Sequence, residues 1–182
     1  MSVRKPEADD KSEMAGRMSE RLIAKTYLPA FQVVTYARDF LLAAQILEQQ
    51  ALNGKSDLFS VAAMNAGLAS EQYLKAFLVE RDPKSPSYVK LIKGISSKEK
   101  HDLHALYLKI PPELREELNS VSERLAPGFP LVDRIKQCSQ LFTHARYGYE
   151  AGSLSILRSE VFQLAPHLDK VLTEMTRTVS AS

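Results

Sequence analysis

The chain has 182 residues, and its 24 basic side chains nearly balance its 22 acidic ones. A formal charge of +2 excludes a protein that coats nucleic acid over its whole surface. An apolar fraction of 45% with 25% charged residues is typical of a globular chain with a buried core and excludes an intrinsically disordered one.

Three further features narrow the class of protein. The single cysteine, Cys138, excludes an intrachain disulfide framework and a cysteine-based zinc ribbon. No run of residues approaches the roughly 18 apolar positions of a membrane span, and the charged N-terminus lacks the apolar core of a signal peptide. Gly (7) and Pro (9) are sparse, which favours long helices. We therefore expect a cytoplasmic, largely helical protein with no membrane contact.

The chain begins with a charged tail and continues into a long helix. Residues 1–13 hold little to bury and predict disorder, so residues 14–180 are expected to form one domain. A short amphipathic segment leads to Pro29, which suits a first helical turn. The long helix that follows is expected to end at Asn53-Gly54, because both residues tolerate the left-handed conformation.

A second long helix, residues 57–81, is expected to be capped by Ser56 or Asp57. A stretch with several Pro and Gly residues follows, and we expect it to be irregular as far as residue 100. A loop of that length in a compact domain usually indicates function or disorder. The helical pattern resumes at His101.

The second half of the chain predicts further helices. Pro111-Pro112 ends one helix and begins another, residues 127–130 form a turn, and helices are expected over 131–150 and 153–179. Pro166 lies inside the last of them, where we expect a kink. No segment shows the alternation that a strand requires, so the fold is predicted to be all-α. We expect an up-and-down antiparallel bundle of five or six helices, in which the two long helices form a hairpin.

One polar stripe interrupts the otherwise apolar second helix. Asn65, Glu71, Gln72 and Lys75 share a face at the helical period. Glu71 and Lys75 are four residues apart and can pair along the helix. If the stripe is solvated, this pair is an ordinary surface contact. If it is buried, the Glu71 carboxylate needs a partner, because desolvating a charge is costly.

Arg146 is a second candidate partner for that carboxylate. It falls at the edge of the apolar stripe of the 131–150 helix, and a guanidinium among core positions suits a bidentate carboxylate. We expect Arg146 to lie within salt-bridge distance of Glu71, with Tyr147 or Asn65 adding hydrogen bonds. The alternative is that Arg146 extends into water.

Two histidines and an aspartate gather at the start of the helix near residue 101. A His-x-x-His pair such as His101 and His104 can hold a metal, but only with a further ligand that the sequence does not identify. Asp102 suits a capping position. We therefore expect a structural role here, with no metal and no other cofactor.

The stretch from Arg81 to Lys100 is strongly basic, with six basic against two acidic residues and a net charge of +4. Such a segment can contact phosphates through counterion release, and an aromatic ring within it can stack on a base. The candidate residues are Arg81, Lys84, Tyr88, Lys90, Lys93, Lys98 and Lys100. The alternative is a solvated loop that its lysines keep soluble.

Three short motifs lie in order along the chain: Glu71 and Lys75 in a Glu-x-x-x-Lys pattern, the run from Lys100 to Leu103, and the pair Arg146-Tyr147. Their order and spacing over about residues 30–175 resemble the HEPN superfamily, the higher-eukaryote and prokaryote nucleotide-binding domain. The resemblance implies an antiparallel helical bundle, often a homodimer, in a nucleotide- or RNA-related system.

The catalytic motif of the ribonucleases in that superfamily is missing. Those enzymes use an Arg followed by a His after four to six residues, and here Ala151, Gly152 and Ser153 occupy those positions after Arg146. Without that general acid–base group, we expect a non-catalytic nucleotide- or RNA-binding module of a defence or toxin–antitoxin system. A cognate nucleotidyltransferase or antitoxin is the candidate partner. The alternatives are a ribonuclease effector with non-standard catalytic residues and a structural oligomerisation protein.

The first long helix is apolar on several sides. Phe40, Leu41, Leu42, Ile46 and Leu47 nearly encircle it, which is more apolar surface than a single-layer bundle can cover. We therefore expect a homodimer.

Overall fold

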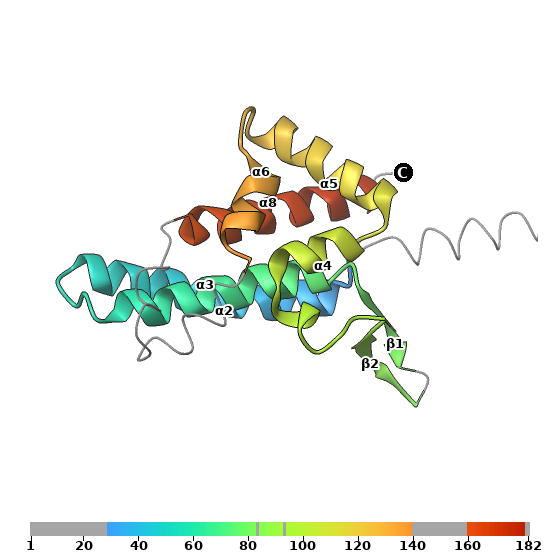
Figure 1. The fold of residues 1–182 in the computed structure, drawn as a ribbon, viewed down its shortest axis with the longest axis horizontal. Helices are drawn as coiled ribbons and strands as arrows, with labels where there is room; N and C mark the ends of the chain where they lie inside the picture. The colour runs from blue at the N-terminus through green and yellow to red at the C-terminus, as the bar shows by residue number, and fades with distance from the viewer. Residues whose placement is uncertain (1–28, 83, 93, 140–159, 181–182) are drawn as a thin grey trace, which may run out of the picture.

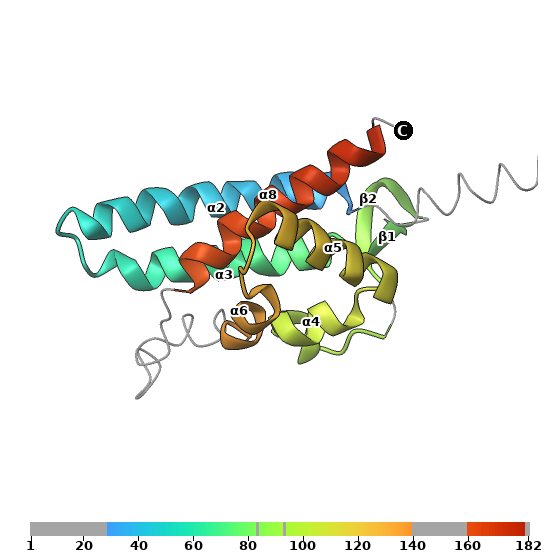
Figure 2. The same cartoon turned by 90° about the horizontal axis from the view of Figure 1, so that it is seen from above.

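The structure is a computed structural model, and it describes residues 29–82, 84–92, 94–139 and 160–180. This part of the chain forms a bundle of α-helices with a small β-hairpin at one end (Figures 1 and 2). The predicted all-α bundle is confirmed, with six α-helices in the described residues. The charged tail, the amphipathic segment before Pro29 and the predicted helix beyond residue 139 lie outside these ranges.

Helices α2 (Phe31–Leu52) and α3 (Leu58–Lys75) form the predicted antiparallel hairpin (Figure 1). Gly54 in the connection has a φ of +104°, in the left-handed region that glycine tolerates best. Asp57 takes the N-cap position of α3, but its side chain makes no capping hydrogen bond. The buried face of α3 carries small residues, which allow neighbouring helices to approach closely. These are Ala62, Ala63, Ala66, Gly67 and Ala69.

A β-hairpin follows α3, so the prediction of a helix to residue 81 without any strand is wrong here. Strand β1 (Val79–Asp82) pairs antiparallel with β2 (Ser85–Leu91), and Glu80 lies opposite Lys90. The Lys90 Nζ atom is 3.8 Å from Glu80 Oε1. A strand of four residues is too short for a period-two pattern to be recognised. It is stabilised by backbone hydrogen bonds to β2, a later segment of the chain.

A short helical segment, η1 (Glu99–His101), follows the hairpin. The turn just before it is closed by reciprocal hydrogen bonds of the capping-box kind between Ser96 and Glu99. The Ser96 Oγ atom accepts a hydrogen bond from the Glu99 amide at 3.2 Å, and Glu99 Oε2 accepts one from the Ser96 amide at 2.8 Å. The hydrogen bonds from Ser96 hold the pKa of the Glu99 carboxyl at about 2. The start of η1 is therefore fixed by local chemistry, and His101 lies at its end.

Asp102 is the N-cap of α4 (Leu103–Lys109), and its Oδ1 atom accepts a hydrogen bond from the Ala105 amide at 2.9 Å. The expected capping role of Asp102 is confirmed. Helix α5 (Pro112–Leu125) begins at the second residue of the proline pair, as predicted.

Helices α6 (Leu131–Gln137) and α8 (Val161–Ser180) complete the described bundle. The turn before α6 contains Gly128 at a φ of +79°. Pro166 lies inside α8, and the helix continues on both sides of it. Helix α8 crosses the α2–α3 hairpin and also packs against α5 (Figure 2).

The core lies where α8 packs against α3. Leu164, Leu168 and Leu172 recur every four residues on α8 and are completely buried, as are Tyr73 and Leu74 on α3. Burying each such side chain contributes about 1.5–3 kcal/mol, so this contact fixes the position of α3. Among the described residues, no helix combines the length and the apolar character that crossing a bilayer requires.

Candidate functional site

The polar stripe of α3 forms a buried cluster with the end of η1. The Lys75 Nζ atom lies 2.5 Å from Glu71 Oε1, and the His101 Nδ1 atom lies 3.1 Å from Glu71 Oε2. We name these three side chains the α3 cluster. Two motifs that are 30 residues apart in the sequence therefore meet at one carboxylate.

The burial of the α3 cluster falls steeply from one side chain to the next. The side chain of Glu71 is 2% exposed and that of Lys75 is 11% exposed, whereas the His101 side chain is 40% exposed. A buried carboxylate is costly without a compensating partner, and Lys75 supplies the opposite charge. The pair is therefore buried rather than solvated, and His101 connects it to the surface.

Local structure holds His101 in place. Asp102, the next residue, caps α4 and also accepts a hydrogen bond from the Ser139 hydroxyl. The Leu103 amide donates to the Ser139 carbonyl at 3.0 Å. The residues after α6 thus anchor the start of α4, and the capping-box hydrogen bonds just before η1 fix the preceding turn.

The arrangement suits His101 to hydrogen bonding and proton transfer. A carboxylate only accepts hydrogen bonds, so the contact with Glu71 has Nδ1 of His101 as the donor. A carboxylate that holds Nδ1 in this way fixes the tautomer and the orientation of an imidazole. The side chain of His101 is 40% exposed, so the ring that Glu71 orients lies at the protein surface.

The other residues predicted for this cluster do not join it in the described structure. The Asn65 side chain donates to the Val61 carbonyl of its own helix at 2.8 Å. His104 contributes its backbone amide, which donates to the Ser139 hydroxyl at 3.3 Å. Arg146 and Tyr147 lie outside the described residues, so their predicted contact with Glu71 stays a prediction.

The basic stretch before His101 is divided between the hairpin and η1. Arg81 lies in β1, and Tyr88 and Lys90 lie in β2. Lys84 and Lys98 are exposed, and Lys100 lies within η1, next to His101. Lys93 lies outside the described residues. The predicted irregular loop is therefore largely ordered, and its last lysines lead directly to the α3 cluster.

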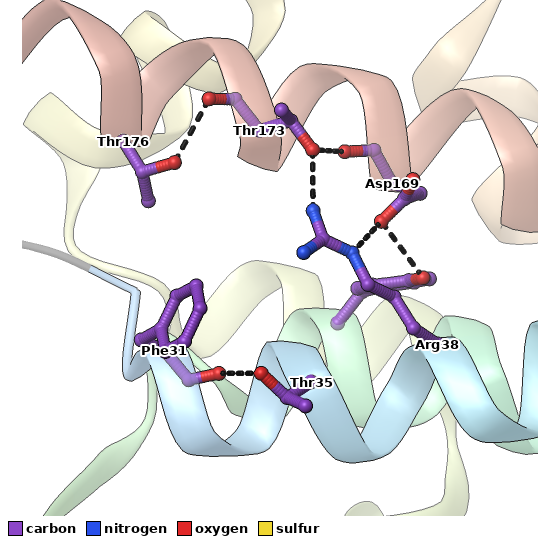
Figure 3. Close-up of polar contacts among 7 residues, drawn as sticks. Phe31, Thr35, Arg38, Asp169, Thr173 and Thr176 are labelled. Carbon is purple, nitrogen blue, oxygen red and sulfur yellow. Dashed lines mark hydrogen bonds and ion pairs between the residues drawn. The ribbon is translucent and has the colours of Figure 1, made fainter.

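A second polar cluster, which the sequence did not indicate, joins three helices (Figure 3). The Arg38 Nε atom lies 2.7 Å from Asp169 Oδ1, and its Nη2 atom donates to Thr173 Oγ1 at 2.6 Å. The Tyr73 hydroxyl donates to the same Asp169 oxygen at 3.1 Å. We name these four residues the α8 cluster. The only signal for it is the four-residue spacing of Asp169 and Thr173 on α8.

The α8 cluster shifts the pKa values of two of its members. The hydrogen bond to Asp169 raises the pKa of the Arg38 guanidinium. Burial, with the neighbouring Asp169 carboxylate, raises the pKa of the Tyr73 hydroxyl far above its ordinary value. Tyr73 therefore stays protonated and acts as a hydrogen-bond donor that ties α3 to α8.

A third buried contact joins α5 to α8. Ser122 Oγ and His167 Nε2 are 2.7 Å apart, and the His167 ring stacks on Phe129 with centroids 3.9 Å apart. Burial lowers the pKa of His167, and the charge of Lys170 adds to this effect. An open surface pocket of about 320 Å³ lies beside Ser122 and Phe129.

Comparison with known proteins does not extend this description. The chain matches no family profile, no curated protein and no solved structure. Among the described residues, no three His, Cys, Asp or Glu side chains gather as they would around a metal ion. The α3 cluster is therefore the candidate site on the strength of its own geometry.

Proposed function

We propose that this chain is a HEPN-like helical module that binds a phosphate-containing ligand, a nucleotide or RNA, at the surface around His101. In this proposal it acts in the cytoplasm as a homodimer within a defence or toxin–antitoxin system, and its candidate partner is a cognate nucleotidyltransferase or antitoxin. One observation carries the ligand proposal: the buried Glu71 carboxylate holds the half-exposed His101 ring at 3.1 Å.

Two basic side chains near His101 in the sequence support an anionic ligand. Lys98 and Lys100 are sequence neighbours of His101, and Lys98 is exposed. Lysine and protonated histidine side chains attract phosphates, and much of their contribution comes from released counterions. The same surface offers a hydrogen-bonding imidazole that Glu71 has already oriented, which reduces the ordering cost of binding.

Ribonuclease activity is the second candidate function, and the same contact favours it. An imidazole oriented by a buried carboxylate is the arrangement that general acid–base catalysis uses. In this alternative His101 acts as the general acid–base, in place of the histidine of the missing Arg-x(4–6)-His motif. Cleavage of RNA that is lost in the His101→Ala variant would favour the enzyme over the binding module.

A titration with fluorescently labelled single-stranded RNA of mixed sequence tests the proposal. We expect wild-type protein to bind, with affinity that falls as salt rises. His101→Ala should weaken binding by roughly tenfold, since a hydrogen bond to a charged group contributes about 1.5–3 kcal/mol. His104→Ala is the matched control, because His104 lies three residues away and makes no hydrogen bond to Glu71 in the described structure.

Two results would contradict the proposal. One is wild-type protein that binds neither this RNA nor a nucleoside triphosphate at low salt. The other is an equal loss of affinity in the His101→Ala and His104→Ala variants, which would indicate a general charge effect. Thermal melts of both variants must first show that they fold like the wild type.

A further inference from the structure

The exposed surface of α2 is almost free of charge. Its exposed large side chains are Phe31, Tyr36, Leu42, Ile46 and Leu52, which are between 55% and 68% exposed. The remaining exposed positions of this helix are Thr or Gln, with Asp39 as the one charged residue. Helix α2 runs along one margin of the bundle (Figure 2), so this surface faces outward.

Helix α5 of the same chain shows what an ordinary solvated surface looks like. Most of its exposed positions are charged: Glu113, Glu116, Glu117, Glu123 and Arg124. The chain thus has charged residues to place on a solvated helix, and α2 lacks them. Interfaces between proteins are depleted in charged residues at their centre and enriched in aromatic and other apolar side chains. Several large apolar side chains exposed on one helix, rather than scattered singly over the surface, favour a binding surface.

We infer that the exposed surface of α2 binds the same surface of a second copy of this chain, with the two α2 helices antiparallel. The inference rests on the homodimer in the proposed function and names its interface. RNA does not suit this surface, because the one basic residue of α2 is Arg38, whose guanidinium is already bound by Asp169 and Thr173. A partner protein bound through charge would find only Asp39 exposed, with Glu48 partly buried and Arg38 already paired with Asp169. A nearly neutral surface is self-complementary.

The position of Asp39 selects the antiparallel arrangement. A two-fold axis near Leu42 places Thr35 opposite Gln49, and a hydroxyl and an amide can hydrogen-bond. It separates the two Asp39 residues by six helical positions, or about 9 Å along the axis. A parallel arrangement would instead place the two carboxylates side by side, which is unfavourable.

The length of α2 suggests the strength of the dimer. A helix of 22 residues is about 33 Å long, so a contact through α2 alone is small beside the interfaces of obligate dimers, which exceed about 2,000 Å². We therefore expect a dimer that dissociates on dilution in the micromolar range.

Cysteine cross-linking tests the interface and its direction. The axes of two packed helices lie about 8–10 Å apart, and each Cα atom lies about 2.3 Å from its own axis. The Cα atoms of two facing Leu42 residues can therefore approach to the roughly 4.4–6.8 Å that a disulfide spans. Leu42→Cys should therefore form a covalent dimer on mild oxidation. Asp39→Cys should not, because its copies lie about 9 Å apart along the axis. Ser120→Cys, at an exposed position of α5, and wild-type protein with its buried Cys138 are the controls.

Light scattering provides a second measurement. Wild-type protein should show twice the monomer mass at high concentration, and Ile46→Glu should give the monomer mass. Leu108→Glu is the matched control, since Leu108 on α4 is 53% exposed against 55% for Ile46, and it should remain a dimer.

A monomeric wild type at every concentration would overturn the inference. A cross-link through Asp39→Cys but not through Leu42→Cys would overturn the antiparallel arrangement. If Ser120→Cys formed as much covalent dimer as Leu42→Cys, the cross-link would reflect random collisions and would contradict a specific α2 interface. RNA binding is measured separately, at His101. A dimer without RNA binding would thus contradict the ligand proposal alone, and a monomer that binds RNA would contradict this inference alone.

Discussion

The α3 cluster and the α8 cluster each join charged side chains from different elements, but they differ in how those charges meet water. In the α3 cluster the Glu71 and Lys75 side chains are 2% and 11% exposed. In the α8 cluster the Arg38 and Asp169 side chains are 37% and 27% exposed. Water therefore solvates part of the second ion pair and almost none of the first.

Because of this difference, the desolvation free energy of the ion pair is high in the α3 cluster and modest in the α8 cluster. A buried ion pair can be replaced by apolar residues of similar volume with little loss, or even a gain, of stability. Stability alone therefore does not account for the buried pair of the α3 cluster, whereas the proposed binding role does. The α8 cluster fits a structural role, because its hydrogen bonds tie α2, α3 and α8 together at modest desolvation cost.

The largest predicted effect is that of removing the carboxylate at the centre of the α3 cluster. Glu71→Ala leaves the Lys75 ammonium buried without its partner, which should destabilise the fold by about 3–5 kcal/mol. Chemical denaturation measures this loss. Glu80→Ala is the control, since the Glu80 side chain is 50% exposed and its contact with Lys90 spans 3.8 Å. Similar losses in both variants would remove the distinction between buried and exposed pairs.

The α8 cluster should respond less strongly. Asp169→Ala removes the acceptor of the buried Tyr73 hydroxyl, and an unsatisfied buried donor costs about 1–3 kcal/mol. Adding Tyr73→Phe removes the stranded hydroxyl as well, so the double variant should recover part of the loss. Urea unfolding of the single and double variants checks this. If Asp169→Ala cost more than Glu71→Ala, the ranking of the two clusters would be reversed.

The neutral pair Ser122–His167 should produce a small effect that depends on pH. Burial lowers the pKa of His167 below its ordinary value of 6.5, so the unfolded chain takes up a proton at this residue before the folded protein does. Stability should therefore be complete above pH 6.5 and fall as the pH decreases below it. Melting temperatures from pH 7.5 down to pH 5 should show a shallower decline in His167→Gln. An identical slope in both proteins would contradict this assignment.

Local chemistry explains which parts of the fold were predictable from the sequence. The connection after α2 follows from Asn53 and Gly54, the start of α5 from its proline pair, and the cap of α4 from Asp102. The β-hairpin was not predicted, because β1 is four residues long. The hydrogen bonds between Ser96 and Glu99 follow a local pattern, Ser-x-x-Glu, that is typical of a capping box.

The two clusters show the same limit. Glu71 and Lys75 are four residues apart on one helix, so their contact could be predicted. The contact of Glu71 with His101 depends on how α3, η1 and α4 pack, and the sequence indicated only that both residues belong to motifs. Arg38 and Asp169 are 131 residues apart, and no local rule connects them.

We propose that the α3 cluster is retained for binding rather than for stability. A double variant, Glu71→Leu with Lys75→Met, separates these two roles, because it replaces both buried charges with apolar side chains of similar size. We predict a melting temperature equal to or above that of the wild type, with RNA binding weakened at least about tenfold because His101 loses its orienting carboxylate. A double variant that binds the labelled RNA as tightly as the wild type would contradict the claim.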